Sequence, residues 1–290
     1  MSNFGGTLKP STVMKKILFP FDFSMTSVNA FAYAIKLAKK VGAEIITVHA
    51  YNFPAGVTNE YYSNLLEMYD VTELGSFENY TNEVPKLREI AEQQKAQHVK
   101  LSHVLENGEA VDTILKLADK NQVDFIVMGT NGASGLEEGL FGSVTERVMN
   151  RSKCIVLAIP GSCNDLSLSK ILFLSQYEQR HKKTLHDLTV FAKAFKAHID
   201  VLQVKPHHSD DEPDTISEWK KEFSNEDIHF HIIGSDTIEE TITDFMELHH
   251  SHLLAMTVKH KGLFERLFYY SIASKMVFHS KIPVLSIPYE

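Results

Sequence analysis

The chain repeats itself, and this internal repeat constrains its fold more than any other feature. Lys15–Ala50 aligns without gaps with Ser169–Val204 at an offset of 154, with 8 identities in 36 positions. Phe125–Pro160 aligns with Leu253–Pro288 at an offset of 128, with 9 identities in 36. Two unrelated windows of this length would share only about two identities. The sequence therefore predicts two copies of one domain in tandem.

The two copies differ in the length of their middle segment. The offsets differ by 154 − 128 = 26 residues, and we assign this excess to the tyrosine-rich stretch from about Asn52 to Pro85 of the first copy. Its aromatic side chains are expected to pack or to form a partner surface. The join is expected near Pro160-Gly161, where a strand ends and small polar residues follow. We therefore expect domains over residues 1–160 and 161–290.

Within the first copy, strand and helix patterns alternate. Lys16–Phe21 and Glu44–Ala50 have the apolar character of buried strands, and Ser24–Val41 between them has helical apolar spacing. The later segments predict a strand, a helix, a strand, a helix and a final strand over Lys100–Leu105, Ala110–Lys120, Asp124–Met128, Ser143–Ser152 and Ile155–Ile159. This alternation predicts an α/β fold with a doubly wound, mainly parallel sheet. In such sheets the ligand crevice lies beyond the carboxyl ends of the strands.

Composition excludes several classes of function. The formal net charge of −8 disfavours nonspecific binding to nucleic acid or to an anionic membrane. The first residues lack the apolar core of a secretory signal, and no later stretch approaches the roughly 18 apolar residues of a membrane span. Cys154 and Cys163 match no metal or redox spacing, so we expect reduced thiols. These features predict a globular cytoplasmic protein.

A glycine-rich loop follows the expected strand that ends at Met128. Its sequence is GTNGASGLEEGLFGS, and its last residue, Ser143, opens a helix. Backbone amides can approach a phosphate only where side chains are absent, and a helix N-terminus adds unpaired N–H donors. The order of strand, glycine loop and helix therefore predicts an anion site. The loop is neither a Walker A motif nor the dinucleotide fingerprint GxGxxG.

The spacing of this loop resembles that of the universal stress protein family, whose ATP-binding members carry G-x2-G-x9-G-[ST]. Gly129, Gly132, Gly142 and Ser143 match this pattern without a gap. The resemblance extends through PFDFS, VHA and GSVTERV, which begin at residues 20, 48 and 142. It therefore covers essentially all of the first copy.

The resemblance implies roles for the matching positions. Asp22 would contact the nucleoside, the backbone near Ala50 would face the adenine, and Gly129 would lie beside the ribose. The phosphates would be held by Gly132, Gly142, Ser143 and Val144. The ligand would be ATP, with Mg2+ as an option. The family also implies five-stranded sheets of strand order 3-2-1-4-5 and a dimer, here a pseudo-dimer of the two copies, with a homodimer of chains as a further option.

The same residues also have simpler, structural interpretations that need no ligand. Ser143 and Glu146 form S-x-x-E, a capping box that stabilises a helix without any ligand. Gly129 and Gly132 would permit a tight connection from strand to helix. Asp22 would cap the helix that follows it. The fixed spacing of the loop favours a nucleotide, and the crevice position of Asp22 favours a ribose hydroxyl.

The second copy has lost this pattern. Thr257, His260 and Tyr270 stand at the places of the three motif glycines, and Gln176 stands at the place of the aspartate. Only the serine is retained, as Ser271. Because side chains now project where amides had to be reached, we expect no nucleotide in this copy. Its expected role is structural.

Two groups of histidines carry potential metal ligands. One is His207-His208 with Asp210-Asp211, and the other is His249-His250 with His252. Neither has an established metal-site spacing, so we expect polar surface segments and no metal site.

Three functions remain open. The leading hypothesis is a stress-response regulatory protein in which the first copy binds an adenine nucleotide and an unidentified protein partner responds to it. The second is slow ATP hydrolysis, although the loop from Gly129 to Ser143 contains no Lys, Arg or His to stabilise a transferred phosphoryl group, and we assign no catalytic residue. The third is a protein-interaction module that holds no nucleotide.

Overall fold

The computed structural model describes residues 16–52, 62–130, 143–163, 167–205, 214–258 and 282–288, without the side chains of 62–74 and 214. The first copy contains β1 (Lys16–Pro20), α1 (Met25–Val41), β2 (Glu44–Tyr51), α2 (Tyr62–Gln93), β3 (Leu101–Asn107), α3 (Ala110–Asn121), β4 (Phe125–Gly129), α4 (Ser143–Arg151) and β5 (Ile155–Ile159). The second contains β6 (Lys170–Leu174), α5 (Gln179–Phe195), β7 (His198–Lys205), α6 (Asp214–Glu222), β8 (Ile228–Gly234), α7 (Ile238–Leu248), β9 (Leu253–Val258) and β10 (Val284–Pro288).

The elements repeat in structure as the sequence does. Strands β1 and β6 have five residues each, helices α1 and α5 have 17 each, and strands β2 and β7 have eight each, all at the offset of 154. The difference lies in the next helix, because α2 has 32 residues and α6 has 9. The longer middle segment of the first copy is therefore mostly this helix.

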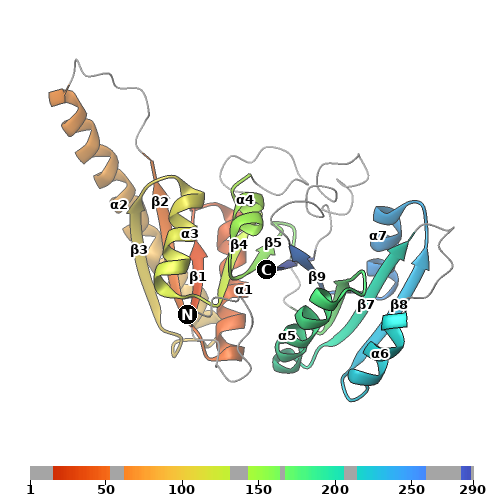
Figure 1. The fold of residues 1–290 in the computed structure, drawn as a ribbon. Coiled ribbons are helices and arrows are strands. Elements are labelled where there is room, and N and C mark those ends of the chain that lie inside the picture. Colours follow the sequence, from red (N-terminus) through yellow and green to blue (C-terminus); the bar gives the residue numbers. More distant parts are fainter. Residues whose placement is uncertain are drawn as a thin grey trace, which may run out of the picture.

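All ten strands of the described chain form one sheet, in the order β3-β2-β1-β4-β5-β10-β9-β6-β7-β8. The α/β fold is thus confirmed, and each copy has the strand order 3-2-1-4-5 that the family resemblance implied. Pairing within each copy is parallel. The structure adds the way in which the copies meet: β5 and β10 pair antiparallel, so the two five-stranded sheets join edge to edge (Figure 1).

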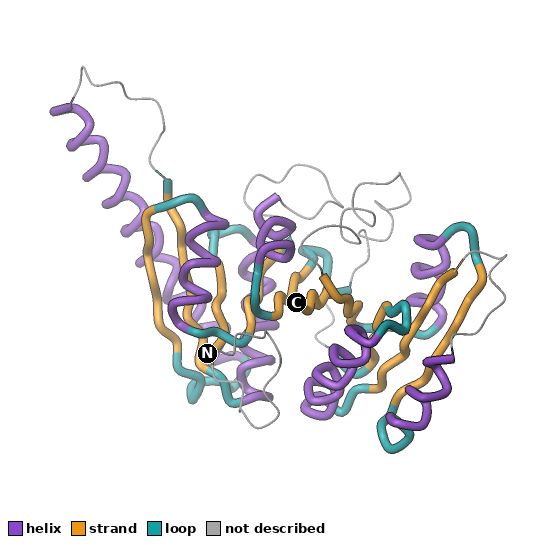
Figure 2. The backbone as a smooth tube through the Cα atoms, in the orientation of Figure 1, coloured by secondary structure: helices purple, strands orange, loops and turns teal. Residues whose placement is uncertain are grey.

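Helices cover both faces of this sheet. Successive strand residues point to opposite faces, so the apolar residues of one strand contribute to the core on each side. Ile17 and Phe19 of β1 belong to the hydrophobic cluster that α1, α2, α5 and α6 cover, whereas Leu18 belongs to the cluster under α3, α4 and α7. Figure 2 shows the helices outside the strands in each copy. The molecule therefore has three layers.

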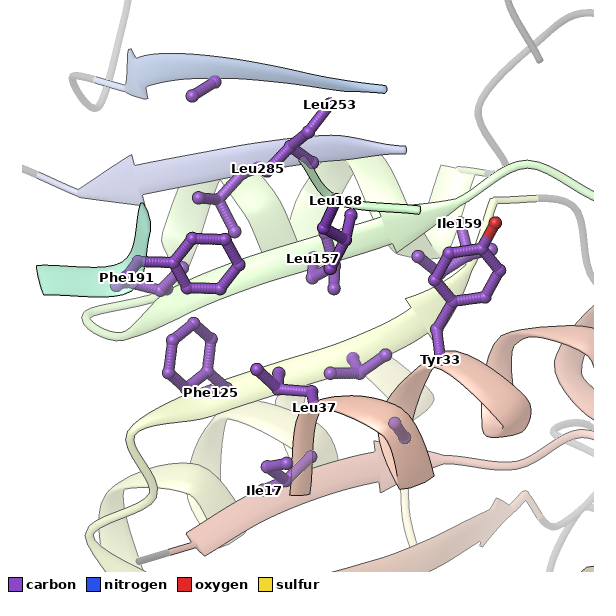
Figure 3. Close-up of a cluster of buried hydrophobic side chains, with 14 of the residues drawn as sticks. Ile17, Tyr33, Leu37, Phe125, Leu157, Ile159, Leu168, Phe191, Leu253 and Leu285 are labelled. Carbon is purple, nitrogen blue, oxygen red and sulfur yellow. The ribbon is translucent and has the colours of Figure 1, made fainter. Parts of the chain in front are cut away.

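The first of these hydrophobic clusters runs without a break across the join. Leu157 of β5 pairs with Leu285 of β10, and both side chains are fully buried. The rings of Phe125 and Phe191, one from each copy, face each other with centroids 6.2 Å apart (Figure 3). The pairing of β5 with β10 also removes two exposed sheet edges, one from each copy. Exposed edges are otherwise sites of nonspecific pairing.

Helix α2 occupies most of the tyrosine-rich segment, for which the sequence predicted no element. It contains Pro85 in its interior, although proline removes a backbone hydrogen bond and costs a helix about 3 kcal/mol. Packing offsets this cost: Tyr80, Leu87 and Ala91 of α2 are buried in the core. The Tyr80 hydroxyl also lies 2.6 Å from Thr47 Oγ1 of β2, so this tyrosine has the packing role that was expected.

Within the described residues, no helix combines the length and the apolar character that a bilayer crossing requires.

Candidate functional site

The strand order of the first copy reverses between β1 and β4. Strand β1 pairs with β2 on one side and with β4 on the other, all parallel, so their carboxyl ends lie at one edge of the sheet. Asp22 lies two residues beyond β1, Ala50 is the penultimate residue of β2, and Gly129 ends β4. Five of the seven residues predicted for the site are described: Asp22, Ala50, Gly129, Ser143 and Val144. Gly132 and Gly142 lie outside the described residues.

Asp22 shapes the turn between β1 and α1. Its Oδ1 atom accepts hydrogen bonds from the Ser24 backbone N–H (3.1 Å) and from the Ser24 hydroxyl (2.6 Å). Ser24 in turn caps α1, because its hydroxyl oxygen accepts from the Ser27 N–H. The helix cap is therefore Ser24 and not Asp22. Asp22 is half-buried and holds the capping residue in position.

Gly129 lies where α1 approaches the end of β4. A Cβ atom at this position would lie 2.8 Å from Thr26 Cγ2 and 3.2 Å from the Thr26 carbonyl, both too close. The Thr145 hydroxyl of α4 donates a 2.8 Å hydrogen bond to the Gly129 carbonyl, which ties the first turn of α4 to the end of β4. The close approach of α1 thus disfavours any side chain at this position, whereas the tight strand-to-helix connection of the simpler interpretation falls on residues 131–142, outside the described residues.

The first turn of α4 presents Ser143 to solvent and turns Val144 toward the core. Ser143 is the first residue of the helix and is exposed, whereas Val144 packs against the hydrophobic cluster under α3 and α4. Arg147, one turn later, pairs with Glu109 at 3.0 Å. Any contact from Val144 to a ligand would therefore come from its backbone N–H.

His49 adjoins the predicted site residue Ala50 but was not itself predicted from the sequence. It precedes Ala50, and its Nδ1–H donates a 2.8 Å hydrogen bond to the Phe21 carbonyl, which leaves the lone pair on Nε2. The ring lies against Phe23 with centroids 4.3 Å apart. Burial lowers the pKa of His49, while the Phe21 carbonyl and the charge of Asp22 raise it, and burial prevails. The histidine of the VHA motif, directly before a strand end, was the available signal.

The corresponding turn of the second copy is closed by a histidine. Gln176, at the place of Asp22, donates its backbone N–H to His181 Nδ1 at 2.9 Å. His181 is buried and stands at the place of Ser27. Thr257, at the place of Gly129, is buried as well. His260, Tyr270 and Ser271 lie outside the described residues.

His181 is expected to make the protein less stable in acid. Burial lowers its pKa to about 4, against 6.5 in the unfolded chain, so the native ring stays neutral while the unfolded chain gains a proton. The contribution of His181 to the free energy of unfolding is complete above pH 6.5 and decreases by about 3 kcal/mol as the pH drops to 4. In urea unfolding at both pH values, His181→Gln should lose correspondingly less stability than the wild type. Equal losses in the two proteins would contradict this assignment.

Of the two histidine groups singled out in the sequence, only the second lies among the described residues. His207, His208, Asp210 and Asp211 lie outside the described residues. His252 Nδ1 is 3.4 Å from the Ser169 hydroxyl, whereas His249 Nδ1 lies 3.8 Å from Asp200 Oδ2, in a different neighbourhood.

Comparison with known proteins identifies relatives of this chain. The model of the Universal stress protein family matches residues 14–160. Universal stress protein MJ0531 of Methanocaldococcus jannaschii is 33% identical over 151 residues, which cover 50% of this chain and 81% of that protein. Universal stress protein YxiE of Bacillus subtilis is 33% identical over 152 residues, 51% of this chain and 99% of its own. A solved universal stress protein from Archaeoglobus fulgidus matches the fold of both copies, with a TM-score of 0.70, 21% identity and coverage of 95% and 97%.

Proposed function

The chain belongs to the universal stress protein family, and from this membership we propose that it is a regulatory protein that binds ATP or a related adenine nucleotide in its first copy only. The observation that carries the proposal is the convergence of Asp22, Ala50 and Gly129 at the carboxyl ends of β1, β2 and β4, with Ser143 opening the helix that follows β4. Ligands of doubly wound sheets bind at this kind of edge.

Each residue has a proposed role that fits its surroundings. Asp22 accepts a ribose hydroxyl, and its bonds to Ser24 hold the carboxylate in place for this task. The backbone at Ala50 faces the adenine, and Gly129 lies beside the ribose. The phosphates, with Mg2+ where it is bound, meet the backbone N–H groups of Gly132, Gly142, Ser143 and Val144.

The second copy has a structural role in this proposal. Its exposed Gln176 has no charge to offer a ribose, and the buried Thr257 replaces a glycine. What it contributes is the core shared through β5 and β10. We propose Pro160-Gly161 as the boundary between the copies, the cytoplasm as the location, and a protein partner whose affinity changes when nucleotide binds.

Nucleotide binding without rapid turnover is the expected behaviour. Rapid phosphoryl transfer needs positively charged groups beside the transferred phosphoryl group, to neutralise the negative charge on its oxygen atoms. The nearest arginine of α4, Arg147, is paired with Glu109 on the side of α3. Binding of ATP with Mg2+, measured by titration calorimetry, should be saturable. Release of ADP should stay slow over the same time. No saturable binding at millimolar ATP would overturn the proposal in favour of a nucleotide-free interaction module, and rapid ADP release would favour an enzyme.

A further inference from the structure

Four imidazole rings surround one buried carboxylate in the second copy. Asp200 of β7 has a side chain that is only 6% exposed. His198 precedes it by two residues on the same strand, and His229 of β8 pairs with it in register. Because residues two apart on a strand share a face, His231 lies on this face too, and His249 approaches from the end of α7. Both strands lie at the far end of the sheet (Figure 1).

Two of these rings, those of His231 and His198, place a nitrogen atom within hydrogen-bond distance of the carboxylate. Asp200 Oδ1 is 2.7 Å from His231 Nε2 and 3.3 Å from His198 Nε2. Both of these imidazoles therefore lie within hydrogen-bond distance of the same carboxylate oxygen.

Nδ1, the other ring nitrogen of His198, makes a hydrogen bond of its own. His198 Nδ1 lies 2.8 Å from Asp227 Oδ1, to which it donates its N–H. With its Nδ1–H donated to Asp227, the atom of His198 left to bind a metal ion is Nε2, which lies beside the Asp200 oxygen. A histidine that donates its second N–H to a carboxylate is the usual arrangement at metal sites.

The spacing of one pair of ligand atoms matches that of a tetrahedral ion. Two ligands at about 2.0–2.1 Å from a tetrahedral Zn2+ lie about 3.3 Å apart. His198 Nε2 and Asp200 Oδ1 are separated by 3.3 Å. His198, Asp200 and His229 each offer one ligand atom, and these three atoms lie within 4.8 Å of one another. His229 is exposed, so its ring is free to close the remaining distance.

From this geometry we propose that His198, Asp200 and His229 bind a divalent transition-metal ion of the Zn2+ type, with one coordination position open to water. Asp227 and His231 position the ligands through hydrogen bonds to His198 and Asp200. Two imidazoles and one carboxylate are a ligand set suited to such ions.

The fold itself does not require this cluster. The first copy has Glu44, Ile46 and Ser102 at the places of His198, Asp200 and His229, and Ile46 and Ser102 pair as Asp200 and His229 do. Ile46 is buried in the apolar core there. Burying a carboxylate costs free energy that burying isoleucine does not, and in the second copy the surrounding imidazoles offset this cost. The cluster is a property of the second copy, on a different part of the sheet from the proposed nucleotide site.

The test is a titration of the full chain with Co2+, whose visible absorption reports tetrahedral nitrogen and oxygen ligation, followed by competition with Zn2+. One ion per chain is expected. His198→Gln and His229→Gln should each weaken binding by about 100-fold or more, since even residues that only orient ligands contribute about 10- to 100-fold. Asp227→Asn should show this smaller loss.

The matched control is His186→Gln. His186 also pairs with a carboxylate, at 2.6 Å from Glu222 Oε1, but lies on the exposed side of α5. This variant should bind Co2+ as the wild type does. The proposal is overturned if the wild type shows no tetrahedral Co2+ spectrum, or if His198→Gln and His229→Gln, with wild-type circular dichroism, bind as tightly as His186→Gln.

Discussion

The Leu285→Ala variant is expected to lose about 2–5 kcal/mol of unfolding free energy, the usual cost of deleting a fully buried leucine side chain. Leu285 is fully buried in β10 and pairs with Leu157 of β5, so the cavity would open in the core that joins the two copies (Figure 3). Urea unfolding at neutral pH measures the loss. Trp219, the chain's one tryptophan, is buried in the second copy and supplies a local fluorescence probe.

The control for this variant is Leu248→Ala at the end of α7. Leu248 is 78% exposed, and its truncation should change stability by no more than about 0.5 kcal/mol. In the wild type, Trp219 fluorescence and far-ultraviolet circular dichroism should report one coincident transition, since the copies share a core. Equal effects of the two leucine variants, or two separate wild-type transitions, would show that the copies are not held together in this way.

The Gly132→Val variant is expected to bind ATP about 100-fold more weakly than the wild type, or not at all. A valine side chain would stand where backbone N–H groups must approach the phosphates. Losing two hydrogen bonds to a charged group costs at least about 3 kcal/mol, which corresponds to about 100-fold in affinity. Titration calorimetry with ATP and Mg2+ measures the change.

Two further variants separate the site from general effects on the fold. His260→Val changes the equivalent position of the second copy and should leave ATP affinity unchanged. Asp22→Asn keeps an oxygen that can accept from Ser24 but removes the charge, and should weaken binding by about 10-fold. Wild-type affinity in both Gly132→Val and Asp22→Asn would mean that the nucleotide binds elsewhere.

Much of the fold followed from the sequence, because the repeat and the alternation of strands and helices are local patterns. The way in which the copies join did not. The pairing of β5 with β10 depends on register between segments that are far apart in the chain, although the fully buried pattern of β5 is typical of a strand covered on both faces. Helix α2 was missed because Pro85 reads as a helix breaker, whereas packing of Tyr80 and Leu87 against the sheet stabilises it.

Of the two candidate sites, one was predicted from the sequence and the other was not. Asp22 and Gly129 were expected to share an edge because the carboxyl ends of parallel strands meet there. The His198, Asp200 and His229 cluster was missed because its members come together only through the pairing of β7 with β8. Its signal in the sequence was His-x-Asp at residues 198–200 and His-x-His at residues 229–231, spacings that share one face of a strand.

The number of adenine nucleotides bound per chain tests the central claim most directly. Equilibrium dialysis of the full chain against saturating ATP with Mg2+ should give one nucleotide per chain, unchanged in His260→Val and absent in Gly132→Val. Two nucleotides per chain would contradict the assignment of a structural role to the second copy, and none would contradict nucleotide binding altogether.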